Sequence, residues 1–180
     1  SEYGSVNDQN TLLASAAPYI MPYNRILDPA GESVAFGDGA LENHSLDATK
    51  VDNDQTLVVE DRYGIAFFDI NTKELVHRWA YNSDERFNGA MSTYSGISSV
   101  VYHDSTFVFW SAGSKQISSN IDGANSYILQ AYWDGKKAQV VKAFPFKALA
   151  PATIALPNQV IPKTENGELY FYTVLNGNNE

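Results

Sequence analysis

Residues 56–81 read TLVVEDRYGIAFFDINTKELVHRWAY, and this stretch decides the fold. Three largely apolar runs, at 56–60, 64–70 and 74–81, are separated by short polar segments. Connections this short join antiparallel strands, because parallel strands need a crossover of about a dozen residues. The stretch therefore predicts three strands of one antiparallel sheet.

The first two of these strands are apolar on both faces. Leu57, Val58 and Val59 are consecutive, and successive residues of a strand point to opposite faces of its sheet. The third strand, at 74–81, mixes apolar and charged residues. A sheet whose inner strands are apolar on both faces must be covered on both sides, so we expect sheets stacked on sheets.

The same pattern recurs along the chain. Strand-like residues precede Leu57, and further strands are predicted at 97–102, 106–111, 126–133, 138–144, 155–161 and 168–175. Leu57 and Phe107 are 107 − 57 = 50 residues apart, and Phe107 and Leu169 are 169 − 107 = 62 apart. Repeats of about 40–50 residues are typical of β-propeller blades, and about 4–8 blades close a propeller. The sequence predicts an all-β fold of antiparallel blades, an incomplete propeller of about two and a half to three blades.

Composition restricts the function classes. The 180 residues include no Cys, which excludes disulfides, thiolate nucleophiles and Cys-ligated zinc. Twelve Lys and Arg against 21 Asp and Glu give a net charge of −9, which disfavours nucleic acid as a partner. No apolar run is long enough to predict a membrane span. Residues 1–30 are predicted to be an extended N-terminal segment with a short helix at 11–17, and residues 31–180 to form the partial propeller.

Residues 54–60 (DQTLVVE), 64–69 (GIAFFD) and 72–76 (TKELV) resemble the YncE-type propeller repeat. Other segments resemble bacterial propeller proteins of Gram-negative envelopes: 22–25, 42–44, 60–64, 91–96, 155–158 and 174–179. The resemblance implies a seven-bladed, lactonase-like propeller, of which this chain holds a part. It also implies a periplasmic or extracellular location in the cell envelope.

Two functions fit this resemblance. The first is a non-catalytic ligand- or protein-binding module of a bacterial envelope protein. The alternative is the N-terminal fragment of a larger propeller-containing hydrolase, of phosphoesterase or lactonase type, whose catalytic residues lie outside this chain. The expected partners are the remainder of the propeller, from the same polypeptide or another subunit, and a small polar ligand at the central channel. No cofactor is expected.

The residues expected to contact that ligand lie in two polar segments. Glu42, Asn43 and His44, with Asn24 and Arg25 upstream, either line the channel or cap loops at its entrance. Asp61 and Arg62 follow the strand at 56–60, and they either bind at the channel mouth or stabilise the turn, with Arg62 pairing a neighbouring carboxylate. One His with one Glu is too few for a zinc site made by the protein alone, so no metal is expected there.

Two other segments resemble known sites more weakly. Asn120, Asp122 and Asn125 surround Gly123 in the manner of a calcium loop, but the bidentate Glu and the spacing are missing. His103-Asp104-Ser105 contains the side-chain types of a hydrolase triad, although neighbours in a turn cannot face one another as a triad requires. We expect a tight turn there and no catalytic residue.

Overall fold

The structure is a computed structural model that describes residues 19–21, 25–27, 33–34, 36–41, 43–93, 96–114 and 123–178. The chain divides into two compact units, Ser1–Glu42 and Asn43–Glu180. In the first unit, β1 (Tyr19–Met21) and β2 (Arg25–Leu27) form an antiparallel hairpin. The helix predicted at 11–17 lies outside the described residues. All other described strands belong to the second unit.

The first sheet of the second unit is a four-stranded antiparallel meander. Its strands follow chain order: β3 (Ser45–Val51), β4 (Thr56–Asp61), β5 (Gly64–Asp69) and β6 (Leu75–Ala80). The last three match the predicted strands to within about a residue at each end. The residues before Leu57, which the sequence predicts only as strand-like, include the strand β3. Two short 3-10 turns, η2 (Tyr81–Ser83) and η3 (Glu85–Phe87), lead out of this sheet.

The second sheet repeats this meander with a divided first strand. Both β7 (Met91–Ser92) and β8 (Ser98–Tyr102) pair with β9 (Ser105–Gly113), at opposite ends of it. Then follow β10 (Ser126–Trp133) and β11 (Ala138–Phe146). A third, two-stranded sheet is the hairpin of β12 (Pro157–Glu165) and β13 (Glu168–Leu175).

The first and second sheets pack face to face through a shared apolar core. Phe67 of β5 stacks on Trp133 of β10 with ring centroids 4.0 Å apart. Trp79 of β6 meets Trp110 of β9 edge-on, with centroids 5.4 Å apart. Burying one such large side chain stabilises the fold by about 1.5–3 kcal/mol, so this interface holds the two sheets together.

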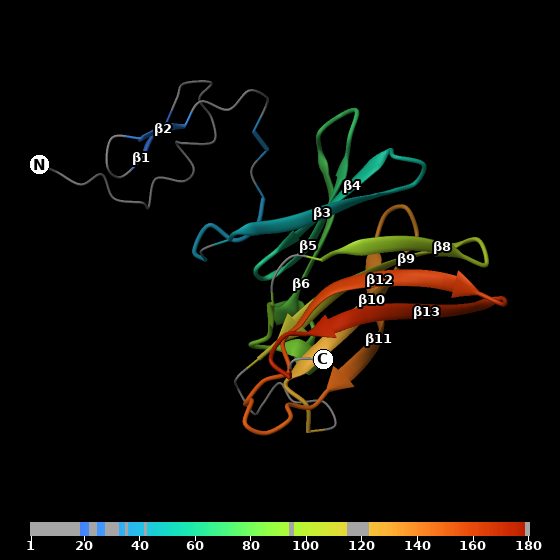
Figure 1. Cartoon of the computed structure of the whole chain (residues 1–180). Coiled ribbons are helices and arrows are strands. Elements are labelled where there is room, and N and C mark those ends of the chain that lie inside the picture. The colour runs from blue at the N-terminus through green and yellow to red at the C-terminus, as the bar shows by residue number, and fades with distance from the viewer. Residues whose placement is uncertain are drawn as a thin grey trace, which may run out of the picture. The chain divides into compact units, whose positions relative to one another are not determined.

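The opposite face of the second sheet packs on the hairpin. Phe109, Ile128 and Val160 are buried there, and Phe171 of β13 lies edge-on to Phe144 of β11 with centroids 4.7 Å apart. The three sheets therefore form successive layers, with the orange and red hairpin β12–β13 beside the second sheet (Figure 1). The structure confirms the prediction of an all-β fold made of antiparallel sheets. In the part of the chain that is described, no helix is long and apolar enough to cross a membrane.

Tight turns join the strands. His103 and Asp104 have φ values of 47° and 58°, the positive values that a two-residue hairpin turn between β8 and β9 requires. The segment 52–54 is likewise a turn, and the Asp52 carboxylate accepts hydrogen bonds from Thr56 Oγ1 at 2.9 Å and from Trp133 Nε1 at 2.7 Å. That turn therefore also anchors β10 to the first sheet.

Candidate functional site

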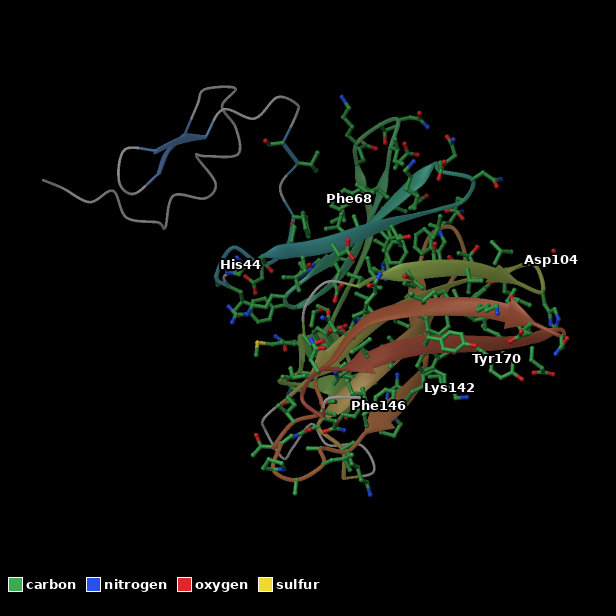
Figure 2. All side chains as sticks on the ribbon, in the orientation of Figure 1. His44, Phe68, Asp104, Lys142, Phe146 and Tyr170 are labelled. Atoms are coloured by element: carbon green, nitrogen blue, oxygen red, sulfur yellow. The ribbon has the colours of Figure 1, made fainter. Side chains whose placement is uncertain are left out.

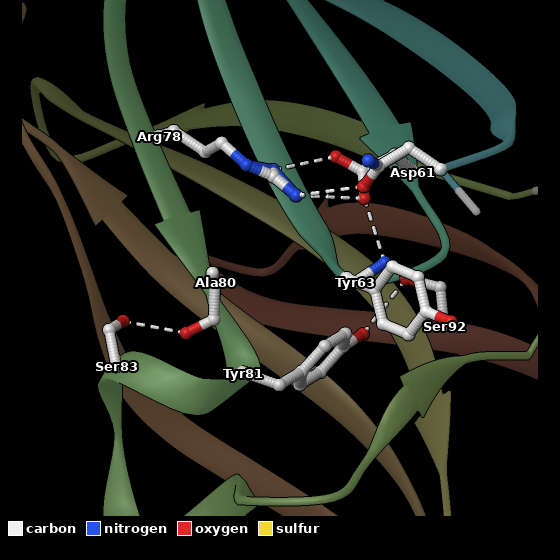
Figure 3. Close-up of polar contacts among 8 residues, drawn as sticks. Asp61, Tyr63, Arg78, Ala80, Tyr81, Ser83 and Ser92 are labelled. Carbon is white, nitrogen blue, oxygen red and sulfur yellow. Dashed lines mark hydrogen bonds and ion pairs between the residues drawn. The ribbon is translucent and has the colours of Figure 1, made fainter. Parts of the chain in front are cut away.

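A buried ion pair joins β4 to β6 across the strand between them (Figure 3). Arg78 donates from Nη1 to Asp61 Oδ2 at 2.9 Å and from Nη2 to Asp61 Oδ1 at 3.1 Å. The ion pair crosses β5, where Gly64 pairs with Asp61 and Ala66 pairs with Arg78 in the sheet register. Small residues leave room for the guanidinium.

Burial dominates the electrostatics of this pair. The Asp61 side chain is fully buried, and burial raises its pKa above the ordinary value. The Tyr63 N–H, which donates to Asp61 Oδ1 at 2.7 Å, and the charge of Arg78 lower that pKa without cancelling the effect. The ion pair is therefore held at a desolvation cost, as is usual for buried pairs.

Four of the residues predicted to contact a ligand come together beside this ion pair. Asn43 Oδ1 accepts from Arg78 Nη2 at 3.5 Å, and the His44 carbonyl accepts from the Arg62 N–H at 3.1 Å. They meet because the start of β3 pairs with the end of β4, where Asp61 lies. The sequence predicts that Arg62 pairs with a neighbouring carboxylate. The ionic partner of Asp61 is instead Arg78, which lies on the third strand of the predicted sheet.

The other predicted contacts lie elsewhere in the chain. Asn24 and Glu42 fall outside the described residues, and Arg25 belongs to β2 of the first unit. Asn120 and Asp122, two of the three residues of the calcium-like loop, also fall outside them. The third, Asn125, donates from its amide to the Thr153 carbonyl at 2.9 Å.

Glu60 is the least expected polar residue of the fold. It is fully buried, and neither of its carboxyl oxygens has a hydrogen-bond partner within the described residues. Burial, followed by the negative charge of Asp47, raises its pKa to about 9, and the nearby Ser92 hydroxyl acts in the opposite direction. Glu60 is therefore a neutral carboxylic acid at pH 7.

Glu60 belongs to a buried polar cluster between the first and second sheets. Tyr81 Oη and Ser92 Oγ are 2.9 Å apart, and Trp110 Nε1 donates to Tyr81 Oη at 3.0 Å. Burial raises the pKa of Tyr81 above its ordinary value, so its hydroxyl keeps its proton. Asp47, opposite Glu60 in the register, accepts the Gly96 N–H at 2.8 Å. Among the described residues, no group of three or more His, Cys, Asp or Glu could hold a metal ion.

Among the described residues, the hollows between the layers include an outer groove and an aromatic cleft. The outer groove, of about 590 Å³, lies where β6 and the η2–η3 turns face β11, and it is lined by both apolar and charged side chains. Arg86, one of its lining residues, donates to Asp84 Oδ2 at 2.6 Å and to the Val140 carbonyl at 3.2 Å. The aromatic cleft, of about 450 Å³, lies between the second sheet and β13.

The segment with triad-type side chains is the tight turn that the sequence predicts. His103 and Asp104 occupy the two turn positions, and the His103 ring stacks on Tyr102 with centroids 4.0 Å apart. Ser105 begins β9 opposite Tyr102. Hairpin geometry accounts for these residues.

Comparison of the chain with family models, with curated proteins and with solved structures gives no match in any of the three. Function must therefore be inferred from the chain's own residues. Among the buried polar groups of the second unit, Asp61 and Arg78 neutralise each other, and Glu60 holds a proton.

Proposed function

We propose that this chain is a ligand- or protein-binding module with β-propeller architecture, in a bacterial envelope protein. The observation that carries the proposal is the face-to-face stacking of three antiparallel sheets in chain order. Consecutive blades of a propeller pack in this way, each on the face of the one before. The YncE-like segments of the sequence agree with such an arrangement.

Hydrogen bonds between the first strands of successive sheets support a radial arrangement. Ser99 Oγ of β8 donates to the Lys50 carbonyl of β3 at 2.9 Å. Ser98 Oγ of the same strand donates to the Val160 carbonyl of β12 at 2.7 Å. In a propeller the first strands of all blades gather around a central channel, so β3, β8 and β12 are the proposed channel strands.

The module is proposed to be completed by the remainder of a propeller, from the same polypeptide or from another subunit. The hairpin β12–β13 has two strands where the other sheets have at least four. On its outer face Tyr170 and Tyr172 are 51% and 57% exposed, and Ile161 and Val174 are exposed beside them. A contiguous apolar face of this kind suits burial beneath a further sheet.

A small polar ligand is proposed to bind at the channel mouth. Asn43, His44, Asp61 and Arg62 lie together at the end of the β3–β4 pair, and the Asp61–Arg78 ion pair would hold them in place. Asn24, Arg25 and Glu42 stay predictions from the sequence, and they belong to the first unit. The channel mouth combines amide, imidazole and charged groups, which suit hydrogen bonding to a polar ligand.

The test combines solution size with turnover. We expect the native particle to be larger than 19.8 kDa, the mass of this chain. We also expect no turnover of p-nitrophenyl acetate, a γ-lactone or p-nitrophenyl phosphate above the buffer rate. A native monomer of 19.8 kDa would overturn the completion of the propeller by other segments. Turnover that is lost in His44→Ala would overturn the proposal of a non-catalytic module.

A further inference from the structure

We propose that Asn166 is a modification site: its side-chain amide cyclises on the backbone nitrogen of Gly167, loses ammonia and, after hydrolysis, leaves an isoaspartyl residue in the turn between β12 and β13. This inference goes beyond the proposed function, because the reaction uses only this chain and water. It rests on how the fold places one dipeptide that occurs three times in the sequence.

Asn-Gly is the dipeptide in which this cyclisation meets the least hindrance. Asparagine is among the thermolabile residues, and its amide carbon lies near the backbone nitrogen of the next residue. A glycine at that next position has no Cβ atom to block the approach. The sequence contains Asn-Gly at 88–89, 166–167 and 176–177. The reacting groups are the same in all three pairs, so the fold decides which pair reacts.

The reaction balances without a cofactor or an oxidant. The Gly167 nitrogen forms a bond to Cγ of Asn166, the bond from Cγ to the amide nitrogen breaks, and the N–H proton leaves with that nitrogen as ammonia. Water then opens the five-membered imide. Cleavage between the imide nitrogen and the backbone carbonyl carbon gives isoaspartate, whereas cleavage between the nitrogen and Cγ gives aspartate.

The pair at 166–167 is open to this reaction. Asn166 and Gly167, with φ values of 51° and 80°, are the two turn residues between Glu165 and Glu168, which pair across the hairpin. Both turn residues are exposed, and nothing lies within 4 Å of a Cβ atom built at Gly167. Within the described part of the chain, neither the Asn166 amide nor the Gly167 N–H makes a hydrogen bond. Local opening costs least at exposed turns of this kind, so the nitrogen and the amide carbon can meet.

The pair at 176–177 is held in place by backbone hydrogen bonds. The Gly177 N–H donates to the Ala155 carbonyl at 2.8 Å, and the Asn176 N–H donates to the Leu156 carbonyl at 3.0 Å. A Cβ atom at Gly177 would lie against the carbonyl oxygens of Ile154 and Ala155, so packed backbone surrounds this glycine. Both hydrogen bonds must break before the imide can close, which lowers the reactive population at least about tenfold.

The pair at 88–89 is anchored by its two neighbours. Phe87 before it and Ala90 after it are buried, and the Ala90 N–H donates to the Phe87 carbonyl at 2.9 Å. These contacts resist the backbone rotation that closes the imide. We therefore expect this pair to react more slowly than the pair at 166–167.

The isoaspartyl product would alter the turn in two ways. Isoaspartate carries the backbone through its side-chain carbon, which adds one methylene to a two-residue turn, and turn length fixes the register of a hairpin. The new carboxylate also joins Glu165 and Glu168, which lie directly opposite each other, and like charges so placed are destabilising. Lys163 offsets little of this charge, because its 3.5 Å ion pair with Glu165 is half-exposed.

The change would also reach the second sheet. The Tyr102 hydroxyl donates to the Gly167 carbonyl at 2.8 Å, which ties the turn at 166–167 to the end of β8. Figure 2 shows Asp104, in the turn that follows Tyr102, at the same end of the layers as the tip of the β12–β13 hairpin. A longer turn would move the Gly167 carbonyl. We therefore expect this hydrogen bond to weaken and the strand ends beside the turn to exchange amide protons faster.

Mass spectrometry of the aged chain tests the site directly. The folded protein is incubated at pH 8, digested and mapped for the imide and its two hydrolysis products, and an isoaspartate-specific methyltransferase distinguishes isoaspartate from aspartate. We expect isoaspartate at Asn166, formed at least about tenfold faster than at Asn176. In urea, where the fold is lost, the three Asn-Gly pairs should react at similar rates.

Variants of the chain locate the reaction. Asn166→Gly removes the reacting amide and keeps a residue suited to a positive φ, so it should abolish isoaspartate in this turn. Asn176→Gly is the matched control, because it makes the same change at a hydrogen-bonded pair, and it should leave the conversion of Asn166 unchanged. Asn166→Asp supplies the charge without the added methylene, so it should quicken amide exchange beside the turn less than conversion to isoaspartate does.

Three results would overturn the inference. The first is no isoaspartate at Asn166 in the folded chain, and the second is conversion of Asn88 or Asn176 as fast as that of Asn166. The third is aspartate as the sole product, because direct hydrolysis of the amide gives no isoaspartate. Unchanged amide exchange after full conversion would overturn the predicted effect on the turn.

Discussion

Glu60 and Asp61 are consecutive at the end of β4 and are both fully buried, but only Asp61 has an ionic partner. Strand geometry separates them, because successive side chains point to opposite faces of a sheet. Glu60 faces the second sheet with Asp47, whereas Asp61 lies on the other face with Arg78. Two neighbouring acids therefore have opposite consequences for stability, and these can be tested one at a time.

Replacing Glu60 by Gln should stabilise the protein at neutral pH. The pKa of Glu60 is about 9 in the fold against an ordinary value of 4.5, so the unfolded chain loses this proton first as the pH rises. The stability contributed by the neutral acid is thus fully present below pH 4.5 and is lost as the pH rises towards 9. At pH 7 we expect Glu60→Gln to raise the free energy of unfolding by up to about 3 kcal/mol.

Urea denaturation between pH 4 and pH 9 measures this effect. The variant should show a flatter dependence of stability on pH than the parent chain. Glu168→Gln, at an exposed carboxyl group of β13, is the matched control and should change stability by less than about 0.5 kcal/mol. A parent chain as stable at pH 8 as at pH 5, with no gain in Glu60→Gln, would contradict a buried neutral acid.

Removing Arg78 should destabilise the protein strongly. Arg78→Met leaves Asp61 buried without its ionic partner, and breaking a buried pair from one side costs about 3–5 kcal/mol. The double variant Asp61→Asn/Arg78→Met should be more stable than Arg78→Met alone, because no unpaired charge is left. Chemical denaturation of both single variants and the double variant measures the coupling between the two residues.

The ion pair of Arg86 and Asp84 is the comparison for this experiment. Its Arg86 side chain is 53% exposed, so solvent screens the attraction and Arg86→Met should cost less than about 1 kcal/mol. Equal losses of unfolding free energy in Arg78→Met and Arg86→Met would mean that burial does not make the Asp61–Arg78 pair more important for stability than an exposed pair.

The strands were predictable because their apolar runs are local signals. The strands at 64–69 and 126–133 are buried on both faces along most of their length, and a short run of this type is readable without its neighbours. By contrast β3, SLDATKV, has only three apolar residues and carries two charged ones, and it becomes a strand through pairing with β4. The two residues of β7 are a strand only because the long β9 extends past β8 to meet them.

The candidate site was predictable only in part, because its central contact joins distant positions. The sequence predicts Asn43, Asp61 and Arg62 as candidate contacts because they are polar residues beside turns, and the structure places them together. The partner of Asp61 is Arg78, seventeen residues away in the sequence and two strands away in the sheet. Finding it requires the register of β4, β5 and β6, which local patterns leave open.

Removing the hydroxyl of Tyr81 should weaken the interface between the first two sheets. In Tyr81→Phe the buried Trp110 N–H and Ser92 hydroxyl both lose the partner that they share, while the ring and its packing are kept. A buried polar group without a partner costs about 1–3 kcal/mol, so we expect a loss of that size in the free energy of unfolding. Tyr132→Phe, at a partly exposed tyrosine of β10, should change stability little. Equal stabilities of the two variants would mean that the hydroxyl of Tyr81 contributes nothing to the interface.

Adding a methyl group at Gly64 should disrupt the pairing of β5 with β6. A Cβ atom there would lie 2.1 Å from the Trp79 carbonyl oxygen, which is backbone and cannot move without breaking the strand pair. Overpacking of this kind costs about 1–3 kcal/mol or more, and Gly64→Ala should also shift Arg78 away from Asp61, because Gly64 lies between β4 and β6. The matched control is Gly39→Ala, since nothing lies within 4 Å of a Cβ atom at Gly39. Thermal unfolding of both variants measures the effect. If Gly64→Ala unfolded at the same midpoint temperature as the parent chain, the two strands could separate at this point without cost.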